Sequence, residues 1–85
     1  MKKYLIKKGS TVLLCRHEDF PPRVIYDTMI SEQDTMFTEN ERIKEPYPKF
    51  TYGVIYYYYF NLPENDRGYR ALAAAPSMVE IIIED

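Results

Sequence analysis

The run YGVIYYYYF, residues 52–60, limits the possible folds more than any other part of the sequence. Tyrosine, valine, isoleucine and phenylalanine favour β-strands, so we predict one strand from Phe50 to Leu62. Successive side chains of a strand point to opposite faces of its sheet. Neither set of alternate residues is polar here, which is untypical of a strand that has one face in water.

Three interpretations of this strand remain open. In the first, the strand is covered on both faces, and its phenol hydroxyls are hydrated at the rim. In the second, one face contacts another protein, because tyrosine is enriched at protein interfaces. In the third, the rings stack on the bases of single-stranded nucleic acid, a binding mode that also needs positive charge nearby.

Short β-prone runs and turns fill most of the remaining chain. The predicted strands are Tyr4–Ile6 and Thr11–Cys15, paired as a hairpin around residues 8–10; residues 24–29 and 35–38, joined by a polar turn at residues 31–34; and the closing run at residues 77–85. Residues 19–23, with two prolines, are expected to break the chain, and a helix over residues 23–37 is the alternative to the strands there.

Alanines at residues 71 and 73–75, followed by Pro76, predict one short helix near residues 65–75. Consecutive strands with short connections are typical of antiparallel sheets. The 85 residues therefore predict a single domain of the α+β or mostly β class, built on a small antiparallel sheet or open barrel with one short helix.

The net charge of −2 predicts no strong overall attraction to nucleic acid, but the charge is unevenly spread. Residues 1–23 carry an excess of four positive charges, whereas residues 24–46 carry an excess of four negative charges. Cys15 is the only cysteine, so no disulfide forms within the chain. With no signal-peptide pattern and no apolar run of membrane-spanning length, we expect a cytoplasmic protein that does not bind membranes.

Catalytic chemistry finds little support in the sequence. Cys15 and His17 are two residues apart on a predicted strand, which separates them by roughly 6–7 Å, too far for direct activation of the thiol. No N/S zinc site, EF-hand spacing, phosphate-binding glycine loop or nucleophile elbow is present, so we expect no metal and no cofactor. A small hydrolase or nuclease remains an alternative, with a site assembled from His17, Glu18, Arg16, Arg67 and Arg70.

The stretch KYLIKKGSTV, residues 3–12, resembles the opening of a LysM domain. The residues that carry the resemblance are Tyr4, Ile6, Lys7, Gly9 and Thr11. The chain departs from that pattern immediately afterwards, where Leu13-Leu14-Cys15 and a double proline replace the expected helix. The resemblance therefore implies no glycan-binding residue in this chain.

These observations favour a small non-catalytic protein-binding module, acting as an inhibitor or as an accessory or scaffold subunit, and possessing the size typical of viral or mobile-element proteins. The predicted contact residues are Tyr52, Tyr56, Tyr57, Tyr58, Tyr59, Glu32 and Asp34. The alternative is a nucleic-acid-binding β domain that combines the tyrosines with Lys2, Lys3, Lys7 and Lys8. A homodimer that covers the tyrosine strand is a further alternative.

Overall fold

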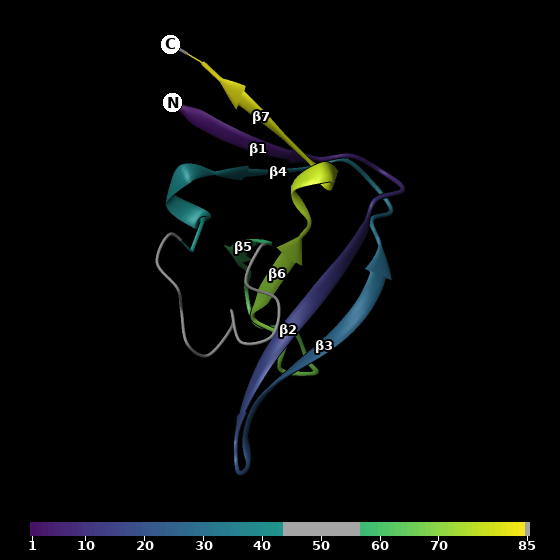
Figure 1. Ribbon diagram of the computed structural model, residues 1–85, viewed down its shortest axis with the longest axis vertical. Coiled ribbons are helices and arrows are strands. Elements are labelled where there is room, and N and C mark those ends of the chain that lie inside the picture. Colours follow the sequence, from purple (N-terminus) through teal and green to yellow (C-terminus); the bar gives the residue numbers. More distant parts are fainter. Residues whose placement is uncertain (44–56, 85) are drawn as a thin grey trace.

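The computed structural model describes residues 1–43 and 57–84. Its elements are β1 (Lys2–Ile6), β2 (Thr11–Asp19), β3 (Pro22–Ile30), β4 (Thr35–Thr38), the 3₁₀ turn η1 (Glu39–Glu41), β5 (Tyr58–Asn61), β6 (Ala71–Ala74), the 3₁₀ turn η2 (Pro76–Met78) and β7 (Val79–Ile83). They form two antiparallel sheets, one with the order β4-β1-β7 and one with the order β3-β2-β6-β5 (Figure 1). The predicted antiparallel, mostly β fold is confirmed.

The predicted helix near residues 65–75 is wrong. Ala71–Ala74 form β6, which lies between β2 and β5 and is buried on both faces. Alanine favours helices, but Gly68, with a φ of +85°, and Pro76 leave too little chain between them for a stable helix. The short alanine side chains instead allow β6 to pack closely at the centre of its sheet.

The predicted pairing of β1 with β2 is also wrong, although the turn between them is right. β1 pairs with β4 and β7, whereas β2 pairs with β3 and β6. Gly9 has a φ of +91°, which suits glycine, and turns the chain from one sheet into the other. This corner is held by the backbone N–H of Gly9, which donates to Ser31 O at 2.8 Å, and by that of Ser31, which donates to Ser10 O at 2.9 Å.

The main core lies between the two sheets. Its buried residues are Tyr4, Ile6, Val12, Phe37, Phe60, Leu72 and Ala74. The Phe60 ring lies at the centre of this core, stacked on Phe37 at 4.4 Å between ring centroids and tilted against Tyr4 at 5.4 Å. A second cluster, made of Cys15, Tyr59, Ala71 and Ala73, occupies the opposite face of the four-stranded sheet.

The strands β2 and β3 form an arm that extends beyond the rest of the molecule (Figure 1). They pair along their whole length, from Thr11 opposite Ile30 to Asp19 opposite Pro22, whereas β6 pairs only with residues 13–15 of β2. Residues 19–23 were expected to break the chain, but they form a tight hairpin turn instead. Pro22 is tolerated because it opens an edge strand. We use "the arm" for residues 16–25, which lie beyond the part of β2 that pairs with β6.

Three further predictions are confirmed. Residues 24–29 are part of a strand rather than a helix, residues 31–34 form the turn before β4, and Val79–Ile83 form the last strand. Of the long strand predicted at residues 50–62, the structure shows β5 at residues 58–61. The rest of its aromatic run, up to residue 56, lies outside the described residues.

Candidate functional site

The tyrosines of β5 lie mostly in the interior. Tyr59 is only 3 % exposed and packs in the second cluster, where a side-chain hydrogen bond joins it to Tyr26. Burial raises the pKa of both phenols above the ordinary value. Tyr58 is partly buried against the main core, and Tyr57, 38 % exposed, is open to solvent. Tyr52 and Tyr56 lie outside the described residues.

Tyr58 instead helps to enclose an arginine. The guanidinium of Arg42 lies 4.9 Å from the centre of the Tyr58 ring and 5.5 Å from that of Tyr4. Arg42 Nη1 also donates to the Tyr4 hydroxyl at 3.1 Å, and that hydroxyl donates to Glu39 Oε2 at 2.5 Å. Burial and the bond to Glu39 raise the pKa of Tyr4. These contacts tie η1 to the core and indicate a structural role for the two rings.

The lysines of the nucleic-acid alternative lie in β1 and in the residues that follow it. Lys3 pairs with Glu84 at 3.0 Å, and Lys7 pairs with Glu80 at 3.7 Å, both across the outer face of the three-stranded sheet. Lys2 lies in the same strand, and Lys8 lies in the corner that follows it. Tyr58 and Tyr59 belong to the other sheet. Of the predicted aromatic residues that the structure describes, Tyr58 and Tyr59 therefore lie in a different sheet from the strand that carries Lys2 and Lys3.

The structure brings together three residues of the hydrolase alternative, because Arg16 contacts both Glu18 and the backbone oxygen of Arg67, but it does not bring His17 to them. His17 and Glu18 are neighbours in β2, so their side chains point to opposite faces of the arm. Burial raises the pKa of the Cys15 thiol to about 12, which keeps it protonated and unreactive. His17 Nδ1 lies 3.2 Å from Asp19 Oδ1 and so contacts a carboxylate at the surface. Within residues 1–43 and 57–84, no three His, Cys, Asp or Glu side chains are placed to hold a metal ion.

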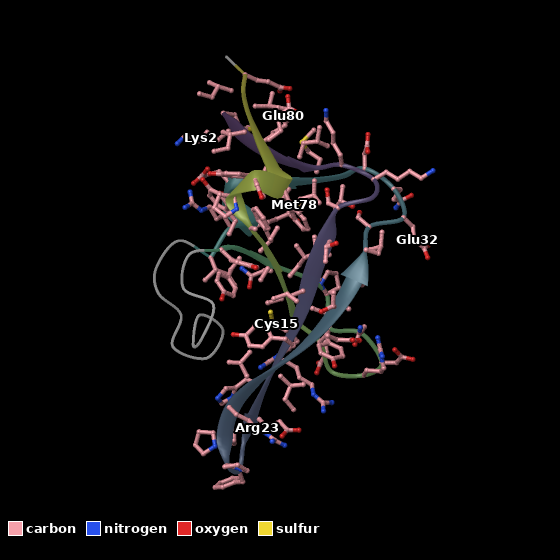
Figure 2. All side chains as sticks on the ribbon, turned by 45° about the vertical axis from the view of Figure 1, so that its right-hand side comes forward. Lys2, Cys15, Arg23, Glu32, Met78 and Glu80 are labelled. Atoms are coloured by element: carbon pink, nitrogen blue, oxygen red, sulfur yellow. The ribbon has the colours of Figure 1, made fainter. Side chains whose placement is uncertain are left out.

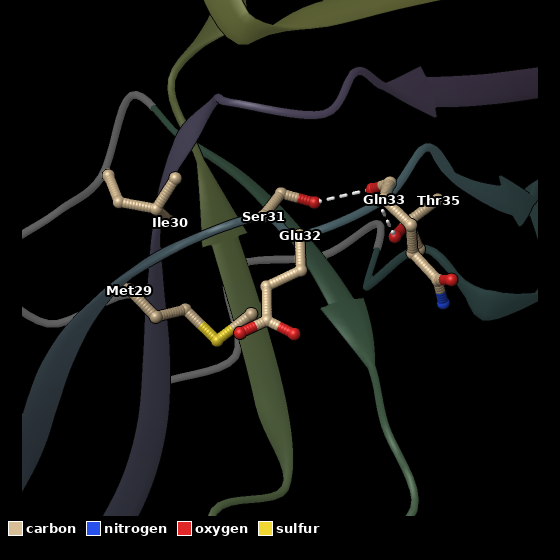
Figure 3. Close-up of a pocket in the computed structure, with 6 residues that line it drawn as sticks. All are labelled: Met29, Ile30, Ser31, Glu32, Gln33 and Thr35. Carbon is tan, nitrogen blue, oxygen red and sulfur yellow. Dashed lines mark hydrogen bonds between the residues drawn. The ribbon is translucent and has the colours of Figure 1, made fainter.

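The predicted docking carboxylates Glu32 and Asp34 lie in the turn between β3 and β4. Glu32 lines an open groove of about 810 Å³ together with Met29, Ile30, Ser31, Gln33 and Thr35 (Figure 3). Asp34 has a structural task, because its Oδ1 accepts a hydrogen bond from the backbone N–H of Lys8 at 2.8 Å. The Ser31 hydroxyl donates to Gln33 O at 2.7 Å and stiffens the same turn. Glu32 is therefore the predicted acidic residue that faces a hollow surface.

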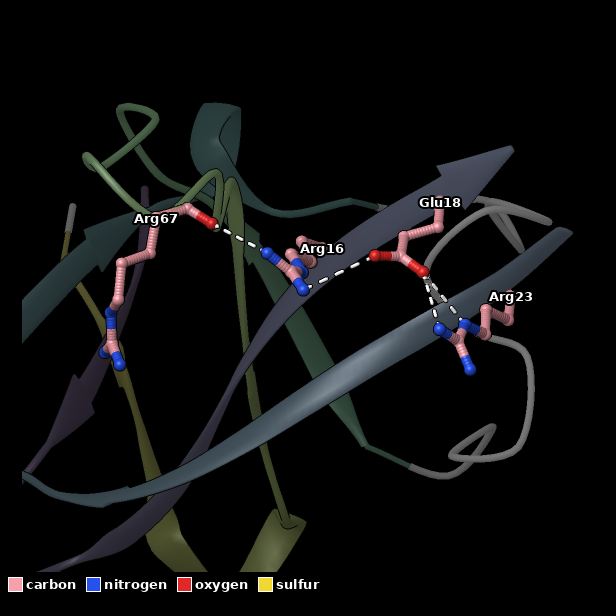
Figure 4. A network of polar contacts seen from close by, with 4 residues as sticks. All are labelled: Arg16, Glu18, Arg23 and Arg67. Atoms are coloured by element: carbon pink, nitrogen blue, oxygen red, sulfur yellow. Dashed lines mark hydrogen bonds and ion pairs between the residues drawn. The ribbon is translucent and has the colours of Figure 1, made fainter. Parts of the chain in front are cut away.

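The arm is a candidate surface that the sequence did not reveal. Phe20 is 95 % exposed and lies at the tip, where the two strands join. Below the tip, Glu18 accepts from Arg23 at 2.8 Å and 2.9 Å and lies 3.4 Å from Arg16 (Figure 4). The sequence feature that could have predicted the arm is the stretch DFPP between two β-prone runs. This stretch is compatible with a break between strands and equally with a hairpin turn.

The base of the arm is fixed to the body of the molecule. Arg16 Nη1 donates to Arg67 O at 3.1 Å, and Arg67 Nη2 lies 3.2 Å from Asp27 Oδ2 of β3. Both guanidinium groups lie over the ring of Tyr69, at 5.5 Å and 5.3 Å from its centre. Cation–π contacts of this kind stabilise an arrangement even near the surface. These contacts therefore fix the base of the arm to the body of the molecule.

Comparison with known proteins adds no assignment. No protein-family model, curated protein or solved structure matches the chain. In the part of the chain that the structure describes, no helix is long and apolar enough to cross a membrane.

Proposed function

We propose that this protein is a small non-catalytic protein-binding module that inserts the tip of its arm into an apolar recess of a partner protein. The observation that carries the proposal is Phe20, a large apolar side chain that is 95 % exposed at the end of a paired, ion-paired hairpin. Exposed apolar residues scattered over a surface are common. A phenylalanine raised above the surface on a braced arm is better placed to fill a partner's pocket than any of the described tyrosines.

The energetics of such contact are favourable. Complete burial of a phenylalanine side chain contributes about 1.5–3 kcal/mol. The arm is already ordered by its strand pairing and by the Arg16–Glu18–Arg23 contacts, so little conformational entropy is lost on binding. Aromatic residues and arginine are both enriched at protein interfaces, and Arg23 stands next to the tip. Filling a recess in this way suits an inhibitor or an accessory subunit.

The proposal is tested by site-specific photo-crosslinking. A photoreactive phenylalanine analogue is placed at residue 20, at Ile30 in the groove, or at Glu64 in an exposed loop as a control. Each protein is irradiated in a lysate of the source cell with and without nuclease treatment, and adducts are identified by mass spectrometry. We expect a discrete protein adduct from residue 20 and none from residue 64.

Binding is then measured with the captured protein and the Phe20→Ala variant. The substitution should weaken binding by at least about tenfold, which corresponds to about 1.4 kcal/mol. It should leave the unfolding midpoint unchanged, because the ring has few contacts within the folded chain. Adducts only from residue 30 would show that the groove, and not the arm, contacts the partner. Equal amounts of adduct from all three sites would refute specific binding. Adducts lost on nuclease treatment would favour the nucleic-acid alternative.

A further inference from the structure

Strand β7 forms an unusually apolar sheet edge. It pairs with β1 on one side, and no strand in residues 1–43 or 57–84 pairs with its other side. Ile81 is 44 % exposed and Ile83 is 72 % exposed. Natural proteins protect such edges with lysine, proline or bulges, because an open edge pairs with other chains. The sequence of β7, VEIII, contains neither lysine nor proline. Its one charged residue, Glu80, is paired with Lys7 of the same sheet region.

One edge strand of the other sheet, β3, is protected by a proline. β3 begins with Pro22, which offers no backbone N–H, whereas its charged residues Arg23 and Asp27 are ion-paired, as Glu80 is in β7. Glu80 and Arg23 lie toward opposite ends of the molecule (Figure 2), and β7 runs beside β1 at the end that carries Glu80 (Figure 1). The edge at β7 therefore lacks the proline that protects the edge at β3.

The ladder with β1 determines which backbone groups β7 presents outward. The backbone N–H of Glu84 donates to Met1 O at 2.8 Å, and the amino group of Met1 donates to Glu84 O. Hydrogen-bonded pairs alternate along an antiparallel ladder, so Ile82 and Glu80 also direct their backbone groups to β1. Ile81 and Ile83 consequently direct their N–H and C=O groups away from β1, to the open edge.

We propose that β7 pairs antiparallel with β7 of a second copy of this chain, with Ile81 facing Ile81 across a two-fold axis. The two three-stranded sheets then form one continuous sheet of six strands. A two-fold axis perpendicular to the sheet keeps corresponding faces together, so residues of the same parity must face each other. The registers that leave most of β7 paired are therefore centred on Glu80, Ile81 or Ile82.

Charge selects one of these three registers. Centring on Glu80 places the two Glu80 side chains directly opposite each other, and centring on Ile82 places Glu80 opposite Glu84. Like charges directly opposite each other destabilise a strand pair. Centring on Ile81 places Glu80 opposite Ile82, Val79 opposite Ile83 and Ile81 opposite itself. This strand is thus self-complementary in one register only, which argues for a second copy rather than an unrelated partner.

The test compares the oligomeric state of the whole chain and of matched charge variants. Sedimentation velocity over a wide concentration series should show a reversible monomer–dimer equilibrium for the unmodified chain. Ile81→Lys should raise the dissociation constant at least about tenfold, because two lysines would meet at the axis. Ile30→Lys, the same change at an exposed residue of β3, should leave the dimer intact.

A mixing experiment tests the register itself. Ile81→Lys and Ile81→Glu should each be monomeric alone, whereas an equal mixture should form a heterodimer, because the opposite charges meet only if residue 81 faces residue 81. Circular dichroism verifies that each variant is folded. An unmodified chain that stays monomeric throughout the series would overturn the proposal. A dimer that Ile81→Lys does not weaken, or variants that fail to associate when mixed, would overturn it as well.

Discussion

Replacement of Phe60 by alanine tests the arrangement of the two sheets most directly. Phe60 belongs to β5 in one sheet and is 0 % exposed, while the rings of Phe37 and Tyr4 that contact it belong to the other sheet. A buried Phe→Ala substitution costs about 3–5 kcal/mol through lost transfer energy and the cavity that remains. A domain of this length has a total stability of roughly 4–13 kcal/mol, so the loss is a large share of the whole.

The measurement is urea unfolding followed by circular dichroism. With a slope of about 1–1.5 kcal/mol per molar urea, a loss of about 4 kcal/mol lowers the midpoint by about 3 M. The matched control is Phe20→Ala, which removes the same atoms from the tip of the arm and should change the stability by less than about 0.5 kcal/mol. If Phe60→Ala does not fold, Phe60→Leu should still fold with a loss of about 1–1.5 kcal/mol, mainly from lost ring contacts. Equal midpoints for the two alanine variants would refute a core between the sheets centred on Phe60.

Three further predictions concern other parts of the fold. Burial raises the pKa of the Cys15 thiol from 9.0 to about 12. Between these pH values the folded chain retains a proton that the unfolded chain loses. The free energy of unfolding should therefore fall as the pH rises through this range, by up to about 1.4 kcal/mol per pH unit. Urea melts at about pH 8 and about pH 11 should show this fall, and Cys15→Ala, which fits beside the alanines of β6, should reduce it. Tyr4→Phe should cost about 1–2 kcal/mol in urea unfolding, because it removes a hydroxyl that bonds Arg42, whereas Tyr57→Phe at an exposed residue should cost less than about 0.5 kcal/mol. Gly9→Ala should lower stability by about 1 kcal/mol through backbone strain alone, since nothing lies within 4 Å of the added methyl group, and a thermal midpoint equal to that of the unmodified chain would contradict this.

The sequence predicted individual strands better than their partners. Residues 79–83 and 35–38 were identified because β-branched side chains and polar turns are local signals. The pairing of β1 with β4 and β7 was missed because the alternation of side chains along a strand indicates only which of them share a face. It does not indicate which other strand lies alongside. A hairpin was assumed for β1 and β2, yet the chain crosses between the sheets at Gly9. That crossing depends on hydrogen bonds to Ser31, more than twenty residues further along the chain.

Burial explains the remaining differences. A helix was predicted at Ala71–Ala74 because helix propensities describe isolated chains. In the folded protein, the close packing of β6 between β2 and β5 favours small side chains instead. The tyrosines of β5 suggested a contact surface, but Tyr59 is buried and Tyr58 packs on the core. Aromatic residues serve both roles, so composition alone does not separate them. The exposure of Phe20 depends on how far the arm extends beyond β6, a tertiary property that no local pattern contains.

Pairing of two copies at β7 would change how strongly the arm binds a partner with several sites. The tip of the arm and the free edge of β7 lie at opposite ends of the 44 Å long axis (Figure 1). A second copy paired at β7 would continue the sheet away from the first arm, so the two tips would face outward in different directions. Such a dimer could not place both tips in one recess, but it could engage a partner that itself presents two sites, or bridge two partner molecules. Because linked sites raise apparent affinity without any new contact, Ile81→Lys should weaken binding to an immobilised, densely spaced partner while leaving the affinity of a single arm in solution unchanged. Phe20→Ala should weaken both, and this difference separates the role of the arm from that of the dimer.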